Sequence, residues 1–302
     1  MKRTFTPGTE WLYLKIYTGV KTADLILEEA IQPVAEYLQK NNEISRWFFI
    51  RYHDPKPHLR VRFCLNNIEN CSAVLSKINH ELQEFTDSGE ISNISIATYD
   101  REIERYGENT MKDAETLFHK NSEFTLQCLH YDDEEKIIVS LFYIDEILNK
   151  LNLNVTEKFA WAKNFNDAFK QEFNADKNLN SQLDRKYRAF KPNFINFIQS
   201  DDFADERKAI IHNIDECTSI LQNIVYYSEN ESREISLQSF FQSIFHMSIN
   251  RLFASNQRLF EMVIYDYLLR YYKTELYNDS KNFDMKKRVA TNRLPIRNLT
   301  LL

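Results

Sequence analysis

The segment WFFIRYHDPKPHLRVRF (residues 47–63) concentrates cationic side chains that could hold an anion. Two apolar and aromatic runs flank a turn with two prolines, which is typical of a β-hairpin. Alternation along the second strand places His58, Arg60 and Arg62 on one face. On a buried face these groups would need an anionic partner. The alternative is an exposed face whose arginine stems lie on the sheet with their heads in water.

The segment YDREIERYG (residues 99–107) supplies a second charged cluster. Glu102 and Arg105 are three positions apart, so on a helical turn they share a side and can form an ion pair. Their alternative interpretation is a solvated charge cluster that closes a domain boundary.

A third segment, SLQSFFQSIFHMSINRLF (residues 236–253), predicts a mostly apolar helix with one uncharged polar stripe. Solvent faces elsewhere in the chain are rich in Lys and Glu, so a stripe without either indicates a polar interior pocket. Imidazole titrates near neutral pH, and His246 could therefore act as an acid or a base there. The alternative is a histidine that is hydrogen-bonded inside a helix interface. The stripe consists of Ser239, Gln242, Ser243, His246 and Asn250.

The composition is that of a globular protein with a large core. The chain has 302 residues, of which 43% are hydrophobic and 14% aromatic, enough for two domains or one large domain with an appended half. Only 4 glycines and 6 prolines favour long helices over an all-β fold. A net charge of −6 argues against a general nucleic-acid binder. No run of about 18 apolar residues occurs, so we expect no membrane span.

Neither a metal nor a cofactor is expected. The 4 cysteines show no CxxC pairing, which indicates reduced thiols in a cytoplasmic protein. The sequence has no P-loop, GxGxxG, HExxH or serine-nucleophile motif. The remaining histidines lack the grouping of metal ligands.

The order of elements before residue 100 is βαββαβ, the order of a ferredoxin-like unit. In that topology the first and third strands are central, and both helices cover one face. The arginine face would then lie in the middle of the sheet, on its open side. Strands are expected at 11–17, 47–52, 59–63 and 91–99, and helices at 22–40, interrupted by Pro33, and 70–85.

We expect an α+β protein in three parts. Residues 1–108 form an α/β sheet subdomain with the arginine strand, residues 109–280 form a helical subdomain with His246, and residues 281–302 form a mobile basic tail. Asp201 and Asp202 are expected as helix caps. Helices are expected at 110–130, 133–152, 156–173, 182–199, 203–227, 235–254 and 256–278.

In order, WFFIRYHDPKPHLRVRF, YDREIERYG and FHMSINR resemble the C-terminal elimination domain of lantibiotic dehydratases, also called the thiopeptide-type bacteriocin biosynthesis domain. The resemblance covers about residues 10–278. One departure is Gly107-Glu108, where family members often have two glycines. The resemblance assigns catalysis to Arg60, Arg62, Glu102, Arg105 and His246, and we expect the nearby His58, Arg51, Asn250 and Arg251 to bind substrate.

Full-length members of this family use glutamyl-tRNA to esterify Ser or Thr of a precursor peptide, and their elimination domain then expels glutamate. Dehydroalanine or dehydrobutyrine remains. Because this chain starts almost directly at the elimination domain, the resemblance implies a split system with a separate tRNA-dependent glutamylation protein. The expected partners are that protein and the precursor peptide, without direct nucleic-acid contact. A lanthionine cyclase and a second copy of the chain are further candidates.

The residue types suit β-elimination, which needs a base at Cα and cations for the departing carboxylate. Arg60 and Arg62 could grip glutamate, Glu102 could orient Arg105, and His246 could move the proton. Two other functions stay open. One is a pyridine synthase that joins dehydroamino acids by a formal [4+2] cycloaddition in thiopeptide pathways. The other is a non-catalytic partner that docks the precursor peptide through an open sheet edge.

Overall fold

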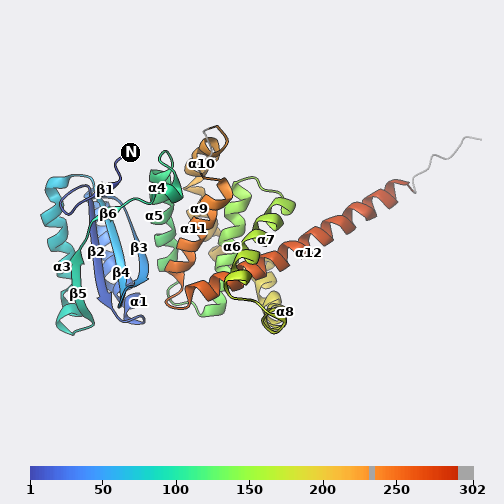
Figure 1. Cartoon of the computed structure of the whole chain (residues 1–302), viewed down its shortest axis with the longest axis horizontal. Coiled ribbons are helices and arrows are strands. Elements are labelled where there is room, and N and C mark those ends of the chain that lie inside the picture. Colours follow the sequence, from blue (N-terminus) through green and yellow to red (C-terminus); the bar gives the residue numbers. More distant parts are fainter. Residues whose placement is uncertain (231–234, 292–302) are drawn as a thin grey trace, which may run out of the picture.

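The computed structural model describes residues 1–230 and 235–291, and in it an antiparallel sheet precedes a long series of helices (Figure 1). The strand order is β3-β4-β2-β5, so the first and third expected strands, β2 and β4, are central as predicted. The α+β class is confirmed. The expected strand 91–99 divides in two, because β6 leaves the sheet to pair with β1. The strands are β1 (Thr4–Phe5), β2 (Trp11–Thr18), β3 (Ile44–His53), β4 (Pro57–Leu65), β5 (Ile91–Ile96) and β6 (Tyr99–Asp100).

Alternation along β4 separates the two faces of the sheet as the sequence predicted. Its apolar residues are buried in one core cluster together with the helices that cover that face. On the other face the pairing register sets Arg62 between Tyr13 of β2 and Phe48 of β3. His58 lies likewise between Tyr17 and Tyr52. Aromatic neighbours therefore flank the polar row of β4.

Two helical segments cover the apolar face. The first is continuous over residues 22–40, and Pro33 lies in the first turn of its last part. Proline lacks the N–H that a helix interior needs, and the π-helical turn directly before it lets the helix continue. The proline thus interrupts the α-helical pattern without ending the helix. These elements are α1 (Thr22–Ile26), the π turn η1 (Leu27–Ile31), α2 (Gln32–Lys40), the 3₁₀ turn η2 (Ile68–Asn70) and α3 (Cys71–Asp87).

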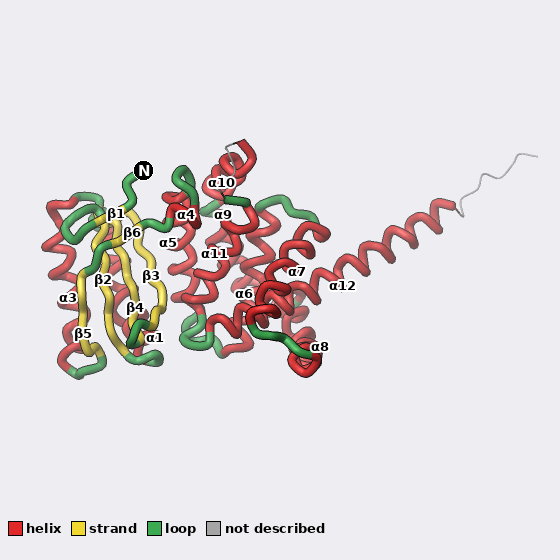
Figure 2. Tube along the Cα trace, viewed as in Figure 1, coloured by secondary structure: helices red, strands yellow, loops and turns green. Residues whose placement is uncertain are grey.

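The rest of the described chain is helical (Figure 2). Three expectations were wrong in detail. The expected helix 203–227 is broken, because the Thr218 hydroxyl bonds the carbonyl of Asp215 (2.7 Å) and competes with the helical ladder. Asp201 and Asp202 lie in a 3₁₀ turn that Ser200 caps. The elements are α4 (Ile103–Tyr106), α5 (Met111–Gln127), α6 (Asp133–Lys150), α7 (Val155–Glu172), α8 (Lys177–Gln199), η3 (Asp201–Phe203), α9 (Ala204–Asp215), α10 (Thr218–Asn230), α11 (Leu237–Leu252) and α12 (Gln257–Thr291).

The last helix is the third difference. It was expected to end near residue 278, but α12 continues to Thr291 and extends away from the other helices (Figure 1). No glycine or proline occurs within it to stop the helix. The expected basic tail therefore begins inside α12, and residues 292–302 lie outside the described part of the chain.

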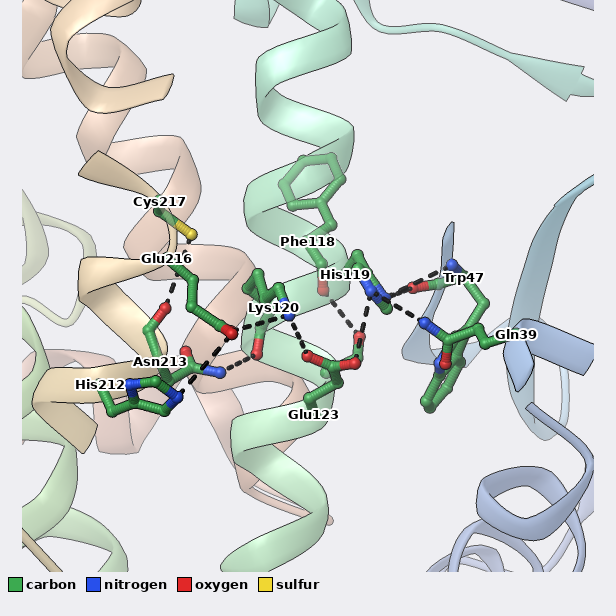
Figure 3. A network of polar contacts seen from close by, with 11 residues as sticks. Gln39, Trp47, Phe118, His119, Lys120, Glu123, His212, Asn213, Glu216 and Cys217 are labelled. Carbon is green, nitrogen blue, oxygen red and sulfur yellow. Dashed lines mark hydrogen bonds and ion pairs between the residues drawn. The ribbon is translucent and has the colours of Figure 1, made fainter. Parts of the chain in front are cut away.

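The outer edge of β3 is sealed by side chains from α5 and α11. The Phe49 N–H donates to Ser122 Oγ (3.3 Å), and Asn250 bonds both the N–H and the carbonyl of Arg51 (3.0 Å each). His119 bonds the Trp47 carbonyl (3.0 Å, Figure 3). Backbone groups on a sheet edge need such partners when they are buried. The seal fixes the helices against the arginine-bearing sheet.

Candidate functional site

A small cavity lies beside Arg62, where the sheet meets the helices. Its volume is about 50 Å³, and β3, β4, residues 99–106, α5 and α11 contribute its walls. This space accommodates a group of a few heavy atoms, such as one carboxylate. Its polar lining includes Arg62, Glu102, Tyr106 and Arg251, and Phe48 and Phe118 are among its apolar residues.

Arg62 is buried, and its guanidinium lies among three aromatic rings. The Arg62 Cζ atom is 4.2 Å from the ring centroid of Tyr13, 4.9 Å from that of Tyr99 and 5.2 Å from that of Phe48. Such contacts stabilise a cation that has lost water. Burial nevertheless lowers the pKa of Arg62. Because its Nε has no hydrogen-bond partner in the described residues, the site holds a desolvated cation with a free donor.

Arg251 reaches the same cavity from α11 and is 1% exposed. Its Nε donates to the Phe49 carbonyl (2.7 Å) and its Nη1 donates to Asn121 Oδ1 (3.2 Å). Its Nη2 is buried without a partner among the residues described. Burial lowers the pKa of Arg251 as well. The structure therefore brings two buried guanidinium groups, 189 positions apart in the chain (251 minus 62), to one cavity.

The segment around α4 closes the cavity. Arg105 Nε lies 3.2 Å from Glu102 Oε2, so the ion pair expected from their spacing is confirmed, with both side chains exposed. Glu102 lines the cavity and Arg105 lies outside its lining. Tyr106 also lines it, and its buried hydroxyl makes no hydrogen bond of normal geometry in the described chain, although the Arg105 side chain lies near it. Burial raises the pKa of that hydroxyl against the opposing effect of nearby Arg105.

Sequence reasoning missed Tyr106. It stands directly beside Arg105, but an aromatic residue at that place has the same signature as a core residue. Only its unpaired hydroxyl distinguishes it, and that is a property of the fold.

The turn after α4 depends on one glycine. Gly107 has φ +76°, and a Cβ there would lie 2.7 Å from Thr110 Oγ1. Any residue with a side chain at position 107 would strain the backbone. The next residue, Glu108, does not have a positive φ, so the second glycine that family members often carry is not required for this backbone conformation.

Arg60 and His58 form a separate pair on the same strand face. Arg60 Nε donates to His58 Nε2 (3.2 Å), and its Cζ lies 3.3 Å from the ring centroid of Tyr52. His58 Nε2 is therefore the acceptor, and its Nδ1 donates to the Lys56 carbonyl (2.9 Å). Burial lowers the pKa of His58, which favours this neutral form. Arg60 is not among the residues that line the Arg62 cavity.

His246 is held by a carboxylate that the sequence did not indicate. Its Nδ1 lies 2.8 Å from Glu261 Oε2 on α12. Glu261 is 1% exposed and also accepts from Arg258 Nη1 (3.0 Å) and the Tyr265 hydroxyl (3.2 Å). With Nδ1 bound, Nε2 of the partly exposed His246 is the nitrogen left for proton transfer. Glu261 lies beyond the loop after α11, so helical spacing could not pair it with His246.

Arg51 and Asn250 make many contacts inside the protein. Arg51 Nε donates to the Arg251 carbonyl (2.8 Å), and its Nη2 forms an ion pair with Asp24. Together with His58 they line another cleft of about 360 Å³. Their expected role in substrate binding stays a prediction.

Two kinds of feature are absent from the described residues. No group of three or more His, Cys, Asp or Glu side chains is arranged to hold a metal ion. None of the helices is both long and apolar enough to cross a membrane.

A family model described as lantibiotic biosynthesis dehydratase C-term matches residues 11–272. The chain is similar to the nisin biosynthesis protein NisB of Lactococcus lactis subsp. lactis, with 26% identity over 282 residues, 85% of this chain and 26% of NisB. It is also similar to the subtilin biosynthesis protein SpaB of Bacillus subtilis, with 25% identity over 270 residues, 84% of this chain and 24% of SpaB. The chain thus spans about a quarter of the length of these curated relatives.

Two solved structures share the fold. The tRNA-dependent lantibiotic dehydratase MibB from Microbispora sp. 107891 aligns with a TM-score of 0.70 and 20% identity over 91% of this chain and 29% of MibB. The pyridine synthase TbtD from thiomuracin biosynthesis aligns with a TM-score of 0.58 and 11% identity over 89% of this chain and 99% of TbtD. At these identities the likeness shows the fold alone.

Proposed function

The chain belongs to the lantibiotic dehydratase C-terminal family, and from this we propose that it eliminates glutamate from glutamylated Ser or Thr of a precursor peptide. A base removes the Cα proton. The electron pair of the broken Cα–H bond forms the Cα–Cβ double bond, and the Cβ–O bond breaks. Glutamate leaves as a carboxylate, and dehydroalanine or dehydrobutyrine remains. The glutamyl ester is supplied by a glutamylating activity outside these 302 residues.

One observation carries this proposal. Arg62 Nε and Arg251 Nη2 are buried without partners in the described residues, the Tyr106 hydroxyl makes no hydrogen bond of normal geometry there, and the three side chains line the same cavity. Unpaired buried donors are costly, so their convergence favours a ligand that accepts hydrogen bonds. A carboxylate matches them in charge and in acceptor number. Glu102 at the cavity is paired with Arg105, which limits its repulsion of that ligand.

The two buried arginines would stabilise the charge that develops on the leaving carboxylate. Arg60, held by His58 and stacked on Tyr52, would extend the positive face of the sheet along the peptide. Glu102 would orient Arg105 from the exposed side of the cavity.

His246 would remove the Cα proton. Glu261 fixes Nδ1 and leaves Nε2 free, the arrangement that orients a histidine base in other enzymes. The charge of Glu261 would also stabilise the imidazolium that forms. Glu261 itself would act through His246 and is a positioning residue.

The test uses a synthetic precursor peptide that carries a glutamyl ester on one serine. The full chain alone should release glutamate and form dehydroalanine, observed by mass spectrometry. Arg62→Met should remove this activity because it deletes the charge but keeps an apolar side chain among the aromatic rings. The matched control is Arg46→Met, since Arg46 bonds only α5 groups, the Lys112 carbonyl (3.1 Å) and Thr116 Oγ1 (3.0 Å), in the described structure. Equal activities of both variants would contradict the proposal.

His246→Ala should slow elimination by roughly 10²–10⁴, the usual loss for a general base, and the glutamylated peptide should accumulate. Complete dehydration by this variant would remove His246 from the mechanism. If Arg62→Met and His246→Ala both process the peptide while omission of the chain stops processing, the chain is a docking partner instead.

A pyridine synthase is the second candidate, supported by the shared fold with TbtD. Cycloaddition releases no glutamate and has no need for paired buried arginines, so the cavity favours elimination. Incubation with a peptide that already contains dehydroalanines separates the two reactions. Consumption of the dehydroalanines would indicate the cyclase.

Several finer features belong to the same proposal. The strand order β3-β4-β2-β5 supports a ferredoxin-like unit, and the change from sheet to helices near residue 108 supports the two subdomains. From the sequence we also propose a cytoplasmic location, a separate glutamylation protein as partner and a homodimer.

A further inference from the structure

A second cleft lies between α2, α5 and α9, and Figure 3 shows several of its lining side chains, such as Gln39, Glu123 and Asn213. The volume of the cleft is about 320 Å³, and it shares no lining residue with the Arg62 cavity. Trp47 forms part of its wall at β3. Three carboxylates line it, those of Glu36, Glu123 and Glu216.

One lysine forms ion pairs with two of these carboxylates. Lys120 Nζ lies 2.8 Å from Glu123 Oε2 and 2.9 Å from Glu216 Oε2. The bond from Lys120 lowers the pKa of Glu216, which is therefore ionised at neutral pH. The third carboxylate, Glu36, accepts a bond from the neutral Gln32 amide (2.8 Å). The cleft thus has more negative than positive groups.

Two histidines lie beside these carboxylates. His119 is buried, and burial lowers its pKa, so the ring 3.4 Å from Glu123 Oε1 is neutral. His212 is exposed, with its Nε2 3.8 Å from Glu216 Oε1.

A buried amide gives an independent indication of a ligand. Asn213 lines the cleft and is 9% exposed. Its Nδ2 donates to the Lys120 carbonyl (3.0 Å), which leaves Oδ1 as a buried acceptor without a partner in the described residues. Such an atom is costly unless a donor reaches it.

We propose that this cleft binds the side chain of a lysine or arginine residue of a peptide. An ammonium or guanidinium brings positive charge and several N–H donors, and these match the carboxylates and Asn213 Oδ1. A coordinated metal ion fits less well, because the described residues offer no group of three ligands. The proposal is independent of glutamate elimination, since the two sites share no residue.

The test uses the full chain and three capped tripeptides whose central residue is lysine, arginine or norleucine, with binding followed by saturation-transfer NMR. The lysine and arginine peptides should bind, more weakly as salt is added, and the norleucine peptide should not. Equal binding of all three would overturn the proposal. Free spermidine is the fourth probe. Binding of spermidine without binding of either basic peptide would overturn the assignment to a peptide.

Two variants locate the binding. Glu123→Gln combined with Glu216→Gln should weaken binding of the lysine peptide by roughly tenfold or more. Ala209→Lys, at an exposed position of the cleft wall on α9, should cause a similar loss by supplying the protein's own ammonium, without altering a buried group. The control is Glu81→Gln on α3, which removes a carboxylate paired with Lys77 (2.7 Å) outside the cleft. Unchanged binding to Ala209→Lys would overturn the site, even if the double variant does not fold.

Discussion

The buried arginines of this protein differ in whether they have a carboxylate partner. Arg101 is 5% exposed and grips the fully buried Glu115 through two bonds of 2.6 and 2.7 Å. Arg62 and Arg251 are also buried but have no carboxylate partner in the described chain. A satisfied ion pair serves the fold, whereas a buried cation with free donors is a cost that a ligand can offset.

This difference predicts that the two arginines affect the free energy of unfolding to different extents. Arg101→Met should destabilise the fold by about 3–5 kcal/mol, because it leaves Glu115 buried without a counter-charge. Arg62→Met should change the free energy of unfolding by less than about 1 kcal/mol, or increase it, while activity is lost. Urea denaturation of both variants is the measurement. A destabilisation of Arg62→Met as large as that of Arg101→Met would show that Arg62 serves the fold.

The contact between His246 and Glu261 also has a test at the residue scale. Glu261→Gln keeps the shape of the side chain but removes the charge that orients and stabilises the imidazolium. We expect kcat to fall by roughly 10²-fold or more with little change in KM. Tyr265→Phe is the control, since it removes a bond to the other oxygen of the same carboxylate (3.2 Å). A loss in KM alone would assign Glu261 to substrate binding.

At the scale of elements, the edge of β3 decides how the molecule is assembled. Helices α5 and α11 use Ser122, His119 and Asn250 to bond the backbone of this strand. A non-catalytic partner that docks the precursor peptide would need an open sheet edge, and the edge at β3 is therefore not available for it. The seal also explains how α11 can bring Arg251 to a sheet that lies far from it in the sequence.

His119 should make this seal sensitive to pH. Its pKa is lowered below the ordinary 6.5, mainly by burial, so the unfolded chain binds the proton first as pH falls. The contribution of neutral His119 to the free energy of unfolding is therefore fully present above about pH 6.5. It is lost as pH falls from that value toward the lower pKa of the folded state. His58, whose pKa burial also lowers, acts in the same direction.

The measurement is Tm by circular dichroism at about pH 7.5 and about pH 5. His119→Gln, whose amide can still donate to Trp47, should show a smaller decrease in Tm than the unmodified chain. The exposed His130, 3.3 Å from Glu28, provides the control variant His130→Gln. An equal decrease in all three proteins would refute the role of His119.

At the scale of the whole molecule, sheet and helices share a core. Trp11, Tyr13 and Phe48 on the arginine face belong to the same cluster as residues of α5 to α12. The other cluster lies between the sheet and its covering helices, and Leu126 and Leu129 also join it from the region of α5. The two expected subdomains are therefore continuous in packing, which favours cooperative unfolding.

A core substitution remote from the sheet tests this cooperativity. Phe194 is buried on α8 and contacts Tyr271, so Phe194→Ala should cost about 3–5 kcal/mol. In a Trp161→Phe background the tryptophans left are Trp11 and Trp47, both in the sheet. Their fluorescence and far-ultraviolet circular dichroism should shift together in urea. A shift of the dichroism alone would show independent subdomains.

The local elements were predictable because their causes are local. Alternation along β4 separated the arginine face from the core face, and apolar spacing located most of the helices, except for α4, the break at Thr218 and the end of α12. The sequence did not predict the helix break at Thr218 or the π turn before Pro33. A side-chain hydrogen bond causes the first, and the backbone itself forms the second. The prediction that the last helix ends near residue 278 was wrong, because no glycine or proline stops α12 there.

The sequence by itself determined which residues are candidates for the chemistry: the polar row of β4, the pair Glu102 and Arg105, and His246. Tertiary structure alone decided how they group. It joined Arg62 with Arg251 and Tyr106, set Arg60 against His58, and placed Glu261 behind His246. Burial and unpaired donors depend on chain segments that meet only after folding, and no pattern within one segment contains that information.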